Sequence, residues 1–209
     1  HGGIPAPLGY EGFPKSVCTS INEEVVHGIP SDRVILKDGD VLSVDCGLIL
    51  DGWQSDSAFT VGVGNVSPED QKLINVTEEC FFKGVRKALN GNHLGDIGHA
   101  VQTYAEGFGY GVIRDLTGHG IGRNMHEEPS VPNFGREGHG VKLRPGMTLA
   151  IEPMIAKGDY HVAELEDGWT VVTEDSSVCS HYEHTIVINE NALPELLSYP
   201  GFALTEEEE

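Results

Sequence analysis

The chain has 209 residues, of which 39% are hydrophobic and 22% charged, enough to bury one sizeable core with little room for a second domain. Its 33 acidic and 13 basic residues give a formal charge of −20, which disfavours docking on nucleic acid or on anionic membranes. No apolar run approaches the roughly 20 residues that span a bilayer, and no segment resembles a signal peptide. The cysteines show no framework spacing, which indicates reduced thiols in a cytosolic protein: Cys18, Cys46, Cys80 and Cys179.

The first thirty or so residues predict loops and short strands, because glycine and proline occur throughout them. Two strands are predicted at residues 41–49 and 53–63, joined at Asp51-Gly52, a dipeptide typical of tight hairpins. These strands contain two carboxylates, Asp45 and Asp56, where a sheet ordinarily has apolar or neutral side chains. The hairpin therefore holds two acids whose partners have to be found elsewhere in the chain.

Two helices are predicted after this hairpin. Ser67 and Pro68 are suited to the N-cap and first position of a helix that Gly91 ends, and Asp96 begins a second helix that runs to about Gly109. Glycine-rich loops follow, with further strands predicted at residues 148–155, 169–173 and 180–188. Strands with two helices inserted between them indicate an α+β fold.

An internal echo indicates that the chain consists of two duplicated halves. The stretch KDGDVLSVD at residues 37–45 matches RPGMTLAIE at residues 144–152, and DGW occurs at both 51–53 and 167–169. Further on, DSAFTV resembles EHTIVI. Each half would then supply one pair of acids, Asp45 with Asp56 and Glu152 with Glu183.

The register of the first hairpin places its two acids on one face. With a two-residue loop at Asp51-Gly52, Asp45 lies opposite Ala58 and Asp56 is its diagonal neighbour, within side-chain reach of a shared ion. The alternative is that this face, otherwise small or polar, is open to water. The opposite face is apolar and is predicted to be core: Leu42, Val44, Cys46, Leu48, Trp53, Phe59 and Val61.

The four acids predict a site for two divalent metal ions. Like charges facing each other across a sheet are destabilising, and two divalent cations would balance the four negative charges. His119, flanked by Gly118 and Gly120 in TGHGIGRNMHEEP, is the candidate nitrogen ligand, because glycines let a backbone approach a site closely. This stretch is not HExxH, which disfavours a helical zinc protease. An oxygen-rich set with one imidazole suits Mn, Fe, Co or Mg, and also allows Zn, without selecting among them.

Taken together, these motifs resemble those of the bacterial type I methionine aminopeptidases. The resemblance runs from about Pro5 to Asn189 and is carried by GYEGFPKSVCTSINEEVVHGIP, KDGDVLSVDCG, DGWQSDSAFTVGVG, GHGIGRNMHEEP, GMTLAIEPM, DGWTVVTEDSSV and HYEHTIVI. It implies a duplicated pita-bread fold, with antiparallel sheets, helices on the outside and pseudo-two-fold halves. It also implies a single catalytic domain over residues 1–209 without the usual N-terminal helical segment. Residues 193–209 match no strong pattern and are expected to form a tail, whose acidic run TEEEE predicts a frayed end.

The resemblance also implies a role for individual residues. Two metals would be bound by Asp45, Asp56, His119, Glu152 and Glu183, and Glu152 would also handle the proton of the attacking water. His27 would lie near the scissile amide nitrogen, and His126 would donate to the substrate carbonyl oxygen. The methionine pocket would be lined by Tyr10, Phe13, Cys18, Met125 and Trp169. No functional role is expected for the histidines at His93, His99, His139, His161, His181 and His184.

The function so implied is removal of the initiator methionine from nascent polypeptides, with a small second residue favoured. The partner would be the N-terminus of a new chain near the ribosome, in the cytoplasm, acted on by a monomer without nucleic-acid or membrane contact. Two alternatives stay open. A proline-specific aminopeptidase or prolidase would share the fold and metal set, and a metal-free pita-bread module would bind peptides without cleaving them.

Overall fold

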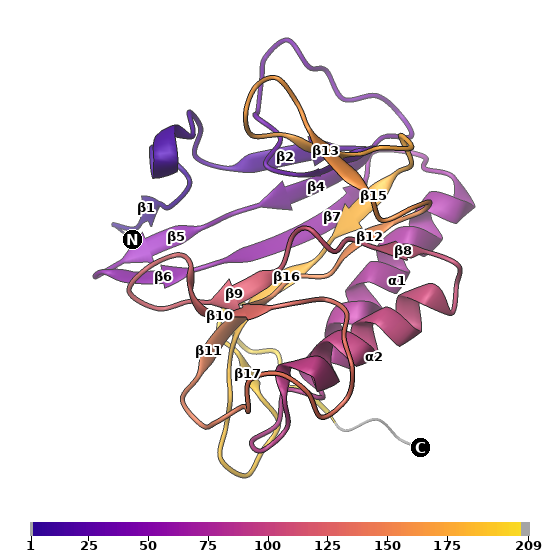
Figure 1. Cartoon of the computed structure of the whole chain (residues 1–209). Coiled ribbons are helices and arrows are strands. Elements are labelled where there is room, and N and C mark those ends of the chain that lie inside the picture. The colour runs from indigo at the N-terminus through magenta and orange to yellow at the C-terminus, as the bar shows by residue number, and fades with distance from the viewer. Residues whose placement is uncertain (1, 206–209) are drawn as a thin grey trace.

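The computed structural model describes residues 2–205, which fold into curled antiparallel sheets with two helices packed side by side against one flank (Figure 1). The largest sheet has eight strands in the order β10-β9-β11-β16-β7-β4-β2, and β17 pairs with β16. Its strands are β2 (Cys18–Ile21), β4 (Val41–Asp45), β7 (Ser57–Gly62), β9 (Gly118–Gly120), β10 (Glu127–Val131), β11 (Thr148–Ile151), β16 (Glu183–Val187) and β17 (Glu195–Leu196).

Three smaller three-stranded sheets flank the large one. Their strands are β1 (Ile4–Pro5), β5 (Leu48–Leu50) and β6 (Trp53–Ser55); β8 (Gly111–Val112), β12 (Met154–Ala156) and β15 (Cys179–His181); and β3 (Glu24–Val26), β13 (Val162–Glu164) and β14 (Val171–Thr173). A short 3-10 turn, η1 (Tyr10–Gly12), precedes β2. None of the helices in the described part of the chain is long and apolar enough to cross a membrane.

The first hairpin has the predicted register. Asp51 and Gly52 both adopt positive φ, 51° and 76°, as a two-residue turn requires, and Asp45 pairs with Ala58. The two predicted strands are each interrupted, at residues 46–47 and at Asp56, so that they form four shorter strands. These interruptions lie next to the acids, where the chain leaves one sheet and enters another.

The helices begin close to the predicted positions. In α1 (Pro68–Val85), the hydroxyl of Ser67 accepts a hydrogen bond from the backbone N–H of Asp70 at 3.1 Å. In α2 (Leu94–Glu106), the N-cap is His93, whose N–H donates to the Asp96 carboxylate at 2.6 Å, so Asp96 is the third helical residue rather than the first. Helix α1 ends at Val85, earlier than the predicted Gly91.

The helices cover the outer face of the second half of the sheet. Phe81 and Val85 of α1 pack in one buried cluster with Ile186, on β16, and with Ile151, on β11. Leu73 of the same helix belongs to a second cluster that includes residues of α2 and β12. The second half therefore has a covered exterior, and its inner face is free to carry polar groups.

The prediction that the outer face of the first hairpin is core is wrong. Trp53, Phe59 and Val61 are 56%, 47% and 42% exposed, Leu48 and Cys46 are also exposed, and Leu42 and Val44 are only half-buried. The reason is positional, because α1 and α2 cover the equivalent residues of the other half. By the internal echo, Phe59 corresponds to Ile186, which is 0% exposed.

The inner face of the same hairpin is buried instead. Val41, Ser43, Ala58 and Thr60 are each at most 8% exposed, and they lie on the face that carries Asp45. The alternative that this face is open to water is therefore wrong. The carboxylates point into the molecule, so they need compensation from within it.

The C-terminal segment continues past β16. Residues Glu195–Leu196 form β17 on the edge of β16, Leu196 is buried, and Leu204 packs on the cluster beneath α1. The expected frayed end of the chain concerns residues 206–209, which lie outside the described residues.

Candidate metal centre

Four acids meet where the two halves of the large sheet join. Asp45 ends β4, Asp56 stands between β6 and β7, Glu152 directly follows β11, and Glu183 begins β16. Strand β16 pairs with β7 through Glu183 and Ala58, which brings the acids of one half beside those of the other. Ligand atoms of Asp56, His119 and Glu183 all lie within 4.8 Å of one another.

His119 presents one ring nitrogen to this cluster. Its Nδ1 lies 2.8 Å from the carbonyl oxygen of Gly120, which can only accept, so the proton of the neutral ring belongs on Nδ1. The lone pair on Nε2 is then available, and Nε2 lies 3.6 Å from Oε1 of Glu152. Burial lowers the pKa of His119 to about 4, so the ring is neutral near pH 7, the form that binds metals.

The glycines beside His119 allow neighbouring strands to approach it closely. A Cβ at Gly118 would lie 2.3 Å from the Ala150 carbonyl oxygen, and one at Gly120 would lie 2.4 Å from the Glu128 carbonyl oxygen. Strand β9 is therefore held between β10 and β11 without side chains on either side of the imidazole.

Substituting Gly118→Ala is expected to displace His119 and weaken metal binding, because the new methyl group collides with rigid backbone. Overpacking of this kind typically costs about 1–3 kcal/mol, measured here as the free energy of unfolding in urea. The matched control is Gly122→Ala, where the nearest atom is the flexible carboxylate end of Glu127, 3.1 Å away. Equal metal affinity for the two variants would show that close approach at Gly118 is unimportant.

The electrostatics of the cluster are unfavourable for a metal-free protein. Burial, and then the charge of Asp56, raise the pKa of Asp45 well above its ordinary value. The pKa values of Glu152 and Glu183 are raised by the same two causes, and burial raises that of Asp56 to about 6. Among the described residues, the basic side chains that lie within 4 Å of these four acids are histidines.

The donor set fits divalent metal ions. Oε1 of Glu183 is buried and has no hydrogen-bond partner among the described residues, so a strong acceptor is left without a donor. Four carboxylates and one imidazole nitrogen are ligands that Mn, Fe, Co and Mg accept. Bound cations would remove the repulsion that raises these pKa values.

Asp56→Asn is expected to stabilise the protein kept metal-free by a chelator, and the gain in stability should increase as the pH rises. Because the pKa of Asp56 is raised from 3.8 to about 6, the folded chain holds a proton that the unfolded chain releases, so ionisation destabilises the folded state over that range. The gain should be absent near pH 3 and complete above pH 6. Urea midpoints of both chains in chelator test this, and a gain that is independent of pH would contradict it.

A cavity of about 290 Å³ opens beside the acids. It is lined by Asp45 and Asp56, and by the seven residues that the sequence assigned to substrate binding: Tyr10, Phe13, Cys18, His27, Met125, His126 and Trp169. Glu152, the third residue assigned to catalysis, does not line it. The rings of Phe13 and Trp169 meet edge to face, with centroids 5.1 Å apart. Aromatic edges, a thiol and a thioether make this cavity suitable for an apolar, sulfur-containing side chain.

His126 lies at the rim of this cavity, with its ring oriented by a tyrosine. The Tyr10 hydroxyl is 2.7 Å from Nδ1 of His126, and burial raises the pKa of that hydroxyl, which therefore keeps its proton. If the hydroxyl donates to Nδ1, the neutral imidazole carries its proton on Nε2. The ring of His119 lies 4.3 Å away, centroid to centroid, which places His126 next to the cluster.

The structure places a sixth side chain beside the acids, His181, to which the sequence interpretation gave no role. His181 is 2% exposed, and its Nε2 lies 3.8 Å from Oε2 of Glu152 and 4.0 Å from Oε2 of Glu183. The available signal was its spacing, because His181 precedes Glu183 by two residues and side chains two apart along a strand share a face.

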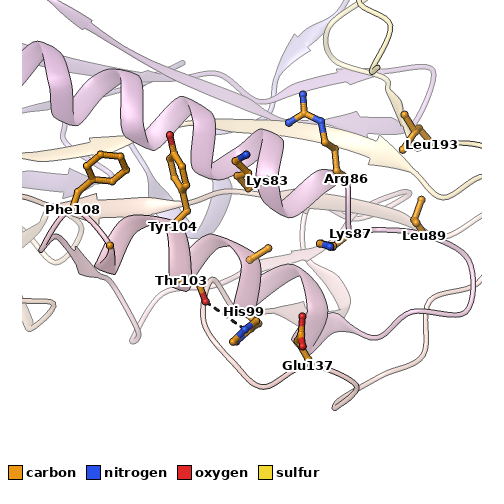
Figure 2. Close-up of a pocket in the computed structure, with 12 residues that line it drawn as sticks. Lys83, Arg86, Lys87, Leu89, His99, Thr103, Tyr104, Phe108, Glu137 and Leu193 are labelled. Atoms are coloured by element: carbon orange, nitrogen blue, oxygen red, sulfur yellow. Dashed lines mark hydrogen bonds between the residues drawn. The ribbon is translucent and has the colours of Figure 1, made fainter. Parts of the chain in front are cut away.

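A larger hollow, of about 810 Å³, lies between α1 and α2, and its lining is basic rather than acidic (Figure 2). Its lining includes Lys83, Arg86, Lys87 and His99. Among the described residues that line it, Glu137 is the one with a carboxylate. Such a surface repels cations, so the smaller cavity beside the acids is the better candidate for a metal site.

Comparisons with known proteins show the family of this chain. The model of metallopeptidase family M24 matches residues 1–190. A methionine aminopeptidase of Clostridium acetobutylicum is 57% identical over 198 residues, which are 95% of this chain and 79% of that protein. The crystal structure of the methionine aminopeptidase of Thermotoga maritima superposes with a TM-score of 0.92 at 47% identity, over 94% of this chain and 78% of that one.

Proteins specific for proline share the fold at greater distance. A prolidase from Pyrococcus furiosus superposes with a TM-score of 0.66 at 22% identity, over 88% of this chain and 49% of that one. This level of identity shows a common pita-bread fold and nothing more about activity.

Proposed function

This chain belongs to metallopeptidase family M24, and we propose that its acid and histidine cluster removes the initiator methionine from new polypeptides, favouring a small second residue. The chain is a metal-dependent aminopeptidase. One observation carries the assignment to methionine. The cavity lined by Phe13, Cys18 and Trp169 opens directly onto Asp45 and Asp56, so an apolar first side chain would place its peptide bond at the acids.

The ligands in this proposal are Asp45, Asp56, His119, Glu152 and Glu183, with two divalent ions among them. When bound, such ions supply Lewis acidity and lower the pKa of water to near neutrality. The carboxylates fix where the positive charge sits, and Asp56 is held in place because Thr185 Oγ1 bonds both its N–H and its carbonyl oxygen, at 3.0 and 2.9 Å.

Three side chains handle the substrate in this proposal. Glu152 accepts the proton of the attacking water, and the Asn133 amide holds its backbone carbonyl at 2.9 Å. His126 donates from Nε2 to the oxygen of the scissile carbonyl, where negative charge develops. His27, which faces the Trp169 ring across 6.5 Å, lies near the amide nitrogen.

The wider setting is also part of the proposal. We propose residues 1–209 as one catalytic domain that works as a monomer on nascent chains near the ribosome, in the cytoplasm. The formal charge of −20 supports a peptide partner, because an acidic surface attracts the cationic N-terminus of a new chain and repels polyanions.

The experiment compares Met-Ala-Ser with Xaa-Pro peptides, each with added Mn(II) or Co(II) and with chelator. The proposal expects cleavage of Met-Ala-Ser, loss of that cleavage in chelator, and slower cleavage when the second residue is bulky. Preferred cleavage of Xaa-Pro peptides would favour a prolidase instead. Failure to cleave either peptide with any divalent metal would leave a peptide-binding module.

A further inference from the structure

His181 is a buried polar side chain aimed at the metal centre and outside the ligand set named above. It ends β15 and is 2% exposed. Its Nε2 is inaccessible to solvent and has no hydrogen-bond partner among the described residues. A buried nitrogen without a partner is uncommon in folded proteins, which points to an interaction that forms when the centre is loaded.

The backbone of His181 is fixed by the strand pair that carries Asp45. The His181 N–H donates to Thr60 Oγ1 at 2.9 Å, and that hydroxyl donates to the His181 carbonyl oxygen at 2.8 Å. The Ser43 hydroxyl lies 2.8 Å from the same Thr60 oxygen. Thr60 therefore bonds both the N–H and the carbonyl oxygen of His181, and Ser43 contacts the Thr60 hydroxyl that does so.

The imidazole of His181 is one of two that flank the Glu152 carboxylate. His119 Nε2 is 3.6 Å from Oε1, and His181 Nε2 is 3.8 Å from Oε2. Glu183 Oε2 is only slightly farther from His181, at 4.0 Å. These separations exceed a hydrogen bond of 2.7–3.2 Å by less than roughly 1.5 Å, so a small side-chain movement closes either gap.

We propose that His181 is a positioning residue: its Nε2–H donates a hydrogen bond to Oε2 of Glu152 and thereby orients that carboxylate for metal binding. The proposal rests on the proposed function only in taking Glu152 as a ligand. Glu152 belongs to the second half of the chain, whereas the Thr60 contact ties His181 to the first. The hydrogen bond therefore sets the position of a second-half ligand relative to Asp45 and Asp56.

The test uses two substitutions that differ in whether they keep a donor. His181→Gln retains an N–H donor of similar reach, and His181→Leu keeps an apolar side chain of similar size without one. The measurement is the Co(II) dissociation constant by calorimetry on substrate-free protein, with the visible absorption spectrum of bound Co(II). The control is His184→Gln, since that ring points away from the acids, with Nδ1 2.9 Å from Ser198 Oγ.

The expected result is a loss of Co(II) affinity of roughly 10- to 100-fold for His181→Leu, the usual effect of losing a partner that orients a metal ligand. His181→Gln should recover most of that affinity with an unchanged Co(II) spectrum. Unfolding of each metal-free variant in urea shows whether the affinity loss reflects misfolding. A stable His181→Leu variant with unchanged Co(II) affinity would overturn the proposal.

Two further outcomes separate this inference from the proposed function. If both variants lose affinity equally and the Co(II) spectrum changes, His181 is itself a ligand and the positioning role is overturned. If the unsubstituted chain binds Co(II) tightly and the series behaves as expected, but Met-Ala-Ser is not cleaved, the proposed function fails and the positioning role stands.

Discussion

Glu183→Gln is expected to lower kcat/KM for Met-Ala-Ser by roughly a thousandfold or more, because it removes the negative charge of one proposed metal ligand. Glu183 is 2% exposed, and its carboxylate lies within 4.8 Å of ligand atoms of Asp56 and His119. The same substitution should raise the free energy of unfolding of the chelated protein, since one of four mutually repelling carboxylates becomes neutral.

The opposite signs of these two effects distinguish a ligand from a structural acid. Metal stoichiometry and peptide cleavage measure the first effect, and urea unfolding in chelator measures the second. The matched control is Glu195→Gln, the same change at an exposed position on the adjoining strand β17. A Glu183→Gln variant that binds the full metal complement, or that is less stable than the parent in chelator, would contradict the arrangement proposed for these acids.

His126→Ala is expected to lower kcat by about 10²–10³-fold while KM and metal affinity stay close to those of the parent. In the proposed function His126 donates to the developing oxyanion, and such a donor acts in the transition state while contributing little to binding of the substrate. Tyr10→Phe should give a smaller loss of kcat, because the imidazole remains and only the 2.7 Å contact that orients it is removed.

The control variant for His126→Ala is His139→Ala, which removes an exposed loop histidine and is expected to leave kcat unchanged. Loss of metal from the His126→Ala variant would mean that His126 helps hold the ions. An effect confined to KM would mean that it binds the substrate and leaves the transition state unassisted.

Local patterns in the sequence were enough to predict the first hairpin. The dipeptide Asp51-Gly52 allows the positive φ angles of a tight turn, and the turn fixes the register, so Asp45 and Ala58 had to pair. Ser67 and Pro68 similarly fixed the start of α1. In both cases the determining interactions involve residues close together in the chain.

What covers a strand could not be predicted in this way. Alternation shows that Leu42 and Phe59 share one face and Asp45 the other, but it does not show which face another segment will bury. The ordinary assumption that the apolar face is the core failed here, because α1 and α2 lie over β11 and β16 instead. The sheet buries its acid face because the two halves curl around it.

The role of His181 escaped prediction for a related reason. Its two-residue spacing from Glu183 is a weak signal by itself, and its approach to Glu152 depends on the contact between β15 and Thr60 of β7. The five proposed ligands were easier to predict, because the echo between the halves and the glycines beside His119 mark them in the sequence. A residue whose role depends on a contact with residues distant in the chain has a weaker signal in the sequence.

The short ladder between β7 and β16 has a mechanical consequence. Within the large sheet, β7 and β16 pair at only two positions, Glu183 with Ala58 and His184 with Ser57, and Asp56 directly precedes this short ladder. Because the proposed ligands come from both sides of this ladder, bound ions would add their binding energy where only two residue pairs join the strands. Removal of the ions is therefore expected to make this ladder a site of limited proteolysis before the rest of the chain unfolds.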